Sequence, residues 1–160
     1  MRGGSFRAKW MEPADYHVTL RFIGDVDART ADEIADILDE VRRAPVTIAF
    51  DGLDWFGGDR PRAIVAKIKP DPALIDLQAA QERRMRRIGL APETRNFLPH
   101  VTLARLRSTS PMAVADYLSS RAGLQAAGFE ASRFVLYSSR DSVGGGPYLV
   151  EATYPLGPGA

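Results

Sequence analysis

The sequence predicts a mixed fold of helices and strands that is built from two similar halves. The tetrapeptide His-Val-Thr-Leu occurs at residues 17–20 and again at 100–103, and it contains the only two histidines among the 160 residues. After each copy, the sequence pattern passes through a helix and then two strands. We therefore expect an internal duplication, in which two strand-helix-strand-strand units are related by a pseudo-twofold axis around a central groove.

The first unit is expected at about residues 16–69. Its helix is indicated by Thr30 and Glu33, which have the spacing of a capping box, and by apolar residues at helical intervals that continue until Pro45. Strand-like runs lie on either side of this helix. They cover 16–23, 46–53 and 62–69, with a turn at Gly57-Gly58-Asp59 before the last run and a shorter run at 6–10 ahead of the first.

A second helix, at about 72–88, is predicted to link the two units. Asp71 can cap it, Pro72 suits its first position, and Gly89 should end it. The second unit, at about 99–155, repeats the pattern of the first. Its helix opens at Ser110 and Pro111, its strand-like runs lie at 99–106, 129–138 and 148–154, and Gly144-Gly145-Gly146 marks a turn.

Charge and composition restrict the possible partners. There are 21 basic and 20 acidic residues and the net charge is +1, so an anion has to be bound by local side chains. The absence of cysteine excludes disulfides, thiolate catalysis and cysteine metal sites. No apolar stretch approaches the roughly 20 residues of a membrane span, and the start lacks the pattern of a signal peptide. We expect a cytoplasmic monomer that does not bind membranes, and the sequence identifies no protein partner.

The repeated tetrapeptide is suited to acid–base chemistry. In an extended strand, His17 and Thr19 point to one face while Val18 and Leu20 point to the other. A single histidine on a strand is ordinarily structural or merely exposed, but a core needs no second His-x-Thr at a matching place. If the two strands lie near each other, two imidazoles and two hydroxyls surround one pocket. No further ligands accompany the histidines at the spacing of a metal site, so we expect no metal and no other cofactor.

Such a pocket fits a cyclic phosphodiester. One neutral histidine takes a proton from the attacking water, and the opposite, protonated histidine donates a proton to the departing ribose oxygen. The threonine hydroxyls can bind the non-bridging oxygens on which charge develops. Because the two histidines act in opposite protonation states, activity should follow a bell-shaped pH curve.

Several phrases of the sequence extend this pattern beyond the two tetrapeptides. They are Arg21-Phe22-Ile23-Gly24-Asp25-Val26, Phe56 with Arg60-Pro61-Arg62, Asn96-Phe97-Leu98-Pro99-His100 and Gly146-Pro147-Tyr148. Together with the paired motifs, they resemble the 2H phosphoesterases, and within them the bacterial RNA 2',3'-cyclic phosphodiesterases, also called 2'-5' RNA ligase-like proteins. The resemblance extends from Trp10 to Pro155.

The resemblance implies a bilobal α+β fold, with two antiparallel sheets around a central cleft and helices on the outside. It implies hydrolysis of RNA 2',3'-cyclic phosphate ends to 2'-phosphates, with His17 and His100 as the catalytic pair and Thr19 and Thr102 binding the phosphate. Proposals for the family favour His100 as base and His17 as acid, and nothing in the sequence itself decides between them. Two departures are expected to matter: the strand and helix that open relatives are absent, and Ser138-Ser139 stands where many relatives have Glu-Ser.

Two further residues are possible substrate ligands. Arg105 stands where some relatives have a phosphate-binding arginine, but strict alternation puts it on the face opposite His100, so it reaches the site only if the strand bends. Phe56 can stack on a base as readily as it can pack in the core. The arginine-rich run at 82–87 is more typical of a solvated helix face than of an RNA contact.

The sequence is also compatible with other functions. The same two histidines would serve a 2'-5' RNA ligase, or a phosphodiesterase for 2',5'-linked or cyclic nucleotides, because the pocket walls select the ligand. A protein that binds RNA ends or small cyclic-phosphate nucleotides without turnover is an alternative of another class. The two complete His-x-Thr motifs argue against it.

Overall fold

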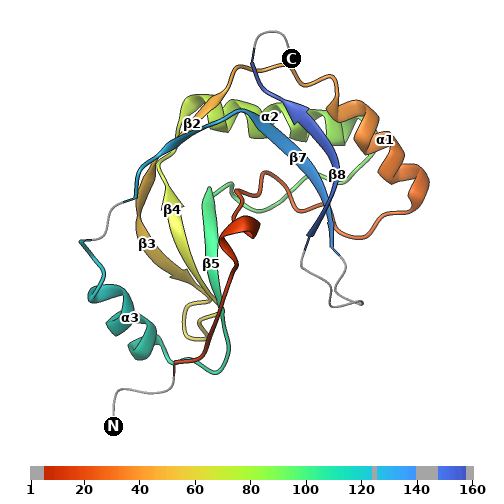
Figure 1. The fold of residues 1–160 in the computed structure, drawn as a ribbon. Coiled ribbons are helices and arrows are strands. Elements are labelled where there is room, and N and C mark those ends of the chain that lie inside the picture. The colour runs from red at the N-terminus through yellow and green to blue at the C-terminus, as the bar shows by residue number, and fades with distance from the viewer. Residues whose placement is uncertain (1–5, 124–125, 140–147, 158–160) are drawn as a thin grey trace. The chain divides into compact units, whose positions relative to one another are not determined.

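The chain divides into two compact units, each assembled from several segments. The computed structural model describes residues 6–123, 126–139 and 148–157 (Figure 1). Unit 1 comprises Met1–Thr19, Ala49–Lys69 and Leu98–Gly128, and unit 2 comprises Leu20–Ile48, Pro70–Phe97 and Phe129–Ala160. Both halves of the sequence therefore contribute to each unit. The fold is α+β with antiparallel sheets, as the sequence predicts.

Unit 1 contains a four-stranded antiparallel sheet. Its strands, in the order in which they pair, are β1 (Ala8–Trp10), β5 (His100–Leu106), β4 (Ala63–Ile68) and β3 (Phe50–Phe56) (Figure 1). One face packs against α3 (Pro111–Ser119) through Ile64, Ala104, Leu106 and Val114, all of them buried. Because side chains alternate along a strand, the neighbouring residues of β4 and β5 point to the opposite face of the sheet.

A β-bulge interrupts the pairing of β5 with β4. Ile64 pairs with Ala104, but the next residue, Val65, pairs with Thr102, so Leu103 is the extra residue. Leu103 packs with the core cluster on the α3 side. A bulge shifts the alternation of the strand that carries it, and this shift decides which residues of β5 share a face.

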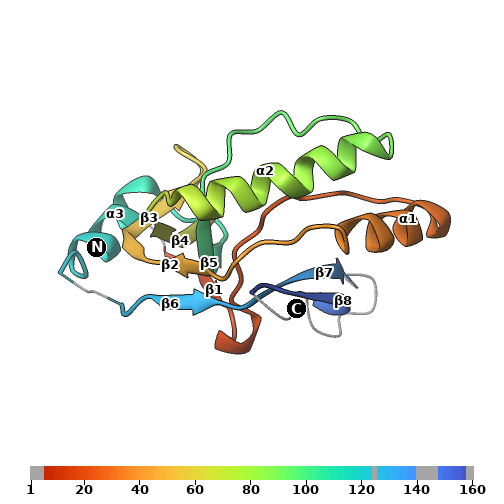
Figure 2. The same ribbon diagram turned by 90° about the horizontal axis from the view of Figure 1, so that it is seen from above.

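Unit 2 is built around two helices, α1 (Ala28–Leu38) and α2 (Pro72–Arg87). The two helices contact each other, and α2 also contacts β2 (Figure 2). The strands of this unit form two antiparallel pairs: β2 (Val46–Ile48) with β6 (Phe129–Ala131), and β7 (Arg133–Ser139) with β8 (Tyr148–Pro155). Tyr154 joins β8 to α1, because its buried hydroxyl donates a hydrogen bond to the carbonyl of Ala35 at 2.7 Å.

Two of the three predicted helix starts are confirmed. The side chains of Asp71 and Ser110 cap α2 and α3, and a proline occupies the first turn of each. The predicted cap at Thr30 is wrong. Asp27 caps α1, because its carboxylate accepts the N–H of Thr30 at 2.8 Å. The Thr30 side chain and then its backbone N–H lower the pKa of Asp27.

Three predicted strands differ from the structure. The runs 46–53 and 129–138 each break into two strands, because their first parts pair with each other as β2 and β6 while β3 and β7 pair elsewhere. The run 16–23 forms only an isolated bridge at Val18. The chain enters unit 2 at Leu20, where Arg21 forms an ion pair with α2 instead of continuing along β5. The predicted turn at 144–146 lies outside the described residues.

Candidate active site

The two tetrapeptides meet along one edge of β5 in unit 1. β1 pairs with the end of β5, the chain makes a 3-10 turn at Pro13–Asp15, and Val18 then forms an antiparallel bridge with Val101. Continuing this register by one residue on either side places His17 opposite Thr102 and Thr19 opposite His100. Val18 and Val101 share the other face, so both imidazoles and both hydroxyls project from the same face of the sheet.

The register also sets the distances between the Cβ atoms of the two histidines and the two threonines. Directly opposite residues on antiparallel strands have Cβ atoms about 5 Å apart, and diagonal neighbours lie roughly 7 to 8 Å apart. His17 and His100 are such a diagonal pair. Two imidazoles at this separation can approach a phosphorus atom from opposite sides, with a threonine hydroxyl beside each of them.

Both imidazoles are oriented in the same way. Nδ1 of His17 lies 2.9 Å from the carbonyl oxygen of Asp15, and Nδ1 of His100 lies 2.6 Å from the carbonyl oxygen of Leu98. In each case the acceptor is the residue two positions upstream. A carbonyl oxygen accepts only, so each Nδ1 is the protonated donor. This leaves Nε2 of each ring as the nitrogen that can exchange a proton with a substrate.

Phe56 lies beside His100. The two rings are 4.7 Å apart between centroids and nearly perpendicular. They come from β3 and β5, on either side of β4, and Val65 of β4 is fully buried although it shares their face. Lys67 is directly opposite His100 on β4 and is exposed. Trp55 packs in the core on the α3 side, and Trp10 contacts Tyr117 of α3.

The bulge brings Arg105 to the face that carries the histidines. On β4, Ala63, Val65 and Lys67 share one face, and their partners on β5 are Arg105, Thr102 and His100. Strict alternation along β5 would have placed Arg105 on the opposite face. The extra residue, Leu103, reverses that expectation.

Besides Lys67, the sequence alone did not single out three other basic residues on this face, namely Arg7, Lys9 and Arg107. Arg7 and Lys9 precede Trp10, and Arg107 follows Arg105 by two residues. The signal that could have found them is the period-two spacing Arg7-Ala8-Lys9 and Arg105-Leu106-Arg107, which is typical of one face of a strand.

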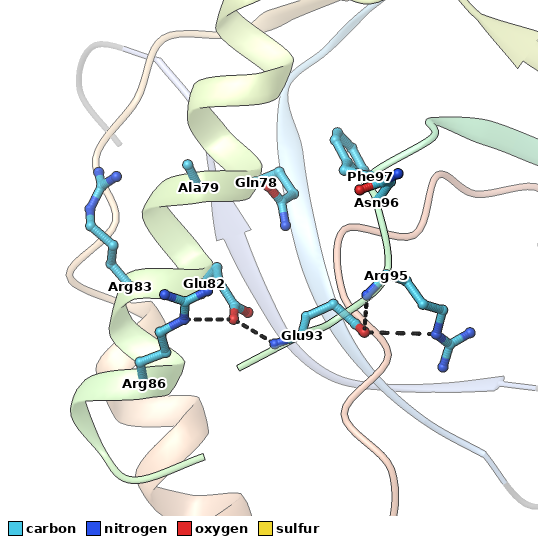
Figure 3. Close-up of a pocket in the computed structure, with 9 residues that line it drawn as sticks. All are labelled: Gln78, Ala79, Glu82, Arg83, Arg86, Glu93, Arg95, Asn96 and Phe97. Carbon is cyan, nitrogen blue, oxygen red and sulfur yellow. Dashed lines mark hydrogen bonds and ion pairs between the residues drawn. The ribbon is translucent and has the colours of Figure 1, made fainter. Parts of the chain in front are cut away.

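Unit 2 contains a separate pocket of about 350 Å³ between α2 and the segment that follows it (Figure 3). Its charged centre is Glu82, which is buried. Oε2 of Glu82 accepts from Nε of Arg86 at 3.0 Å and from the backbone N–H of Glu93 at 2.9 Å. Nε of Arg21 lies 2.7 Å from Oε1 of Glu82, as an ion pair without the geometry of a hydrogen bond. Neither histidine lines this pocket.

The arginine-rich run on α2 is largely paired within unit 2. Arg87 contacts Glu40 at 3.1 Å, Arg84 lies 3.9 Å from the same carboxylate, and Arg86 contacts Glu82. These contacts tie the run to Glu40 and Glu82 within unit 2.

After α2, Glu93 also has a basic partner. The pKa of Glu93 is lowered because the backbone N–H and then the charge of Arg95 stabilise its carboxylate.

The described part of the chain contains no group of three or more His, Cys, Asp or Glu side chains placed to hold a metal ion. Within the same residues, no helix has both the length and the apolar character that crossing a membrane requires.

A family model and two curated relatives place the chain in the same family. A family model described as the 2'-5' RNA ligase superfamily matches residues 2–142. The RNA 2',3'-cyclic phosphodiesterase of Aquifex aeolicus is 29% identical over 154 residues, which cover 93% of this chain and 82% of that protein. The protein of the same name from Bacillus subtilis is 34% identical over 100 residues, which cover 61% of this chain and 55% of that protein.

Two solved structures share the fold. Escherichia coli LigT complexed with 3'-AMP has a TM-score of 0.71 at 21% identity, over 93% of this chain and 81% of that chain. The protein TT0787 of Thermus thermophilus has a TM-score of 0.74 at 20% identity, over 96% of this chain and 84% of that chain.

Proposed function

Because the chain belongs to the 2'-5' RNA ligase superfamily, we propose that it hydrolyses RNA 2',3'-cyclic phosphate ends to 2'-phosphates. Relatives from Aquifex aeolicus and Bacillus subtilis carry the name of this activity. The observation that carries the proposal is the bridge between Val18 and Val101, since its register brings both His-x-Thr motifs to one face of one sheet.

The proposed reaction needs two proton transfers. Nε2 of one histidine takes a proton from water as the water oxygen bonds to phosphorus. The bond from phosphorus to the 3' oxygen breaks, and Nε2 of the other histidine donates a proton to that oxygen. The product carries a 2'-phosphate and a 3'-hydroxyl. We assign His100 as the base and His17 as the acid, with Thr19 and Thr102 binding the non-bridging oxygens.

Metal independence is part of this proposal. The backbone carbonyls of Asp15 and Leu98 orient the two imidazoles, so that Nε2 of each ring is the nitrogen available for proton transfer. The acid–base pair accounts for both proton transfers without a Lewis acid.

The test uses a short RNA that ends in a 2',3'-cyclic phosphate, incubated with the full chain in EDTA. We expect a 2'-phosphate product, a bell-shaped pH profile, and a loss of about 10²- to 10⁴-fold in kcat for His17→Ala and for His100→Ala. Thr102→Val should lower kcat by about 10²-fold, whereas Thr47→Val, at an exposed position on β2, should leave kcat unchanged. Abolition of activity by EDTA would refute metal independence, and binding without turnover would favour a binding protein.

The acid and the base can be told apart with a substrate whose 3' leaving atom is sulfur. A thiolate leaves without being protonated, so the variant that lacks the acid should regain most of its rate on this substrate. We expect rescue of His17→Ala and none of His100→Ala. The opposite pattern would exchange the two roles. Addition of an RNA with a free 5'-hydroxyl reports 2',5' joining, which is the ligase alternative.

A further inference from the structure

Four exposed basic residues continue the face that carries the His-x-Thr motifs. Lys9 is directly opposite Arg105, and the backbone N–H of Arg107 donates to the carbonyl of Arg7 at 3.1 Å, which extends the same register by two residues. Residues two apart on a strand share a face, so these side chains form two successive rows on the side of the histidines. We call Arg7, Lys9, Arg105 and Arg107 the basic track.

The basic track has no neutralising partner in the part of the chain that the structure describes. Like charges directly opposite each other on antiparallel strands are destabilising, and both rows of the track are such pairs. Among the described residues, no carboxylate forms an ion pair with any of its four side chains. An arrangement of this kind is explained when an anion lies across it.

The outer row of the track is held by a buried side chain. Thr109 is 7% exposed, and its hydroxyl oxygen accepts the N–H of Arg7 at 2.9 Å. The same hydroxyl lies 3.2 Å from the carbonyl of Arg7 and 3.1 Å from that of Arg107, so it can donate to either. The backbones that carry this row are therefore fixed before any ligand binds.

Protection of a sheet edge does not account for the track. Lysine on an edge strand prevents pairing with another sheet, and this would explain Lys9 on β1. Arg105, in contrast, lies on β5, which is paired on both sides by β1 and β4. The charge of Arg105 therefore does not protect an edge of the sheet.

We propose that the basic track binds the phosphodiesters that precede the cyclic phosphate in a single-stranded RNA. This inference rests on the function proposed above and specifies its substrate class. The β4 partners of Thr102 and Arg105, Val65 and Ala63, are two residues apart, and Arg107 is two residues beyond Arg105. Each row therefore lies about 7 Å beyond the one before it, starting from the row of His17 and Thr102, because two residues of a strand span that length. Two rows accommodate two upstream phosphates, which a trinucleotide end supplies and a mononucleotide lacks. Arg7, Lys9 and Arg107 thereby select RNA ends over small cyclic nucleotides.

The first test measures KM and kcat for a nucleoside 2',3'-cyclic phosphate and for a trinucleotide with the same end. We expect the wild-type KM to be lower for the trinucleotide. Arg7→Gln, Lys9→Gln and Arg107→Gln should each raise the trinucleotide KM by about tenfold, with no change for the mononucleotide. Lys9→Arg should retain the wild-type KM. The matched control is Arg29→Gln on α1, whose side chain is 92% exposed.

The second test separates the track from the reaction. Fluorescence anisotropy measures binding of an unreactive hexanucleotide with a 3'-hydroxyl end over a series of salt concentrations. Each of the three Gln variants should reduce the slope of log affinity against log salt by about 0.7, the value for one single-strand phosphate contact. If the wild type shows no turnover, but the three Gln variants still bind the hexanucleotide more weakly and with less salt dependence than the wild type, the proposed function is refuted. The proposal that the basic track binds RNA phosphates would then still hold. If the three Gln variants instead turn over every substrate normally and bind RNA as Arg29→Gln does, the proposal for the basic track is wrong, while the proposed function holds.

Discussion

Arg21 and Glu82 form a buried ion pair, and its removal should destabilise the protein. Replacing Glu82 by alanine leaves the Arg21 guanidinium, whose side chain is 7% exposed, without its carboxylate. Removal of one partner of a buried ion pair costs about 3 to 5 kcal/mol. The backbone N–H of Glu93 also loses its acceptor, at roughly 1 kcal/mol. We expect the free energy of unfolding to fall by about 4 kcal/mol or more.

The assay is urea unfolding followed by circular dichroism, with the midpoint and slope compared between variants. The matched control is Glu33→Ala on α1. Its partner Arg29 lies 3.9 Å away, and the two side chains are 92% and 52% exposed, so the loss there should stay below about 0.5 kcal/mol. The double variant Arg21→Met/Glu82→Leu should recover most of the stability, since it leaves no charge buried. A loss below about 1 kcal/mol for Glu82→Ala, or no recovery in the double variant, would refute this reasoning.

Two further predictions concern the turn beside Phe56 and the buried phenol of unit 2. Gly57 has φ +112°, and a Cβ there would meet the carbonyl oxygen of Arg60 at 2.3 Å, so Gly57→Ala should destabilise by about 3 kcal/mol. Gly58→Ala, with φ +54° and open space, should cost only about 1 kcal/mol in the same urea assay, and equal losses would contradict the steric argument. Burial, followed by Asp39 and Asp36, raises the pKa of Tyr154 above its usual 10.0, so the stability it contributes is complete below about pH 10 and is lost as pH rises through the folded value. Tyr154→Phe should lose about 1 kcal/mol at neutral pH with its hydrogen bond to Ala35, yet show a smaller fall in Tm between pH 9 and pH 11 than the wild type, and parallel pH curves would disprove it.

Local sequence signals predicted the elements that depend on neighbouring residues. A cap and a proline at Asp71-Pro72 start a helix wherever they are followed by a suitable run, because the bonds concerned lie within one turn. The same local reasoning failed at Thr30, since Asp27 offers a competing cap only three residues earlier. Local reasoning also predicted one strand at 46–53 where the structure has β2 and the start of β3. The two strands pair with different partners, and no signal in the neighbouring residues shows this.

The amino-acid sequence specifies which reactive groups this protein carries: two histidines, each with a threonine two residues on, in a chain without cysteine. Alternation along a strand, which is a local property, already placed each histidine beside its threonine. Which strands pair with each other becomes apparent in the folded chain alone. The register of Val18 with Val101, the bulge at Leu103 that turns Arg105 toward the histidines, and the alignment of Lys9 with Arg105 all depend on pairing between distant segments. Such pairing is set by the packing of the whole sheet, so no window of neighbouring residues contains it.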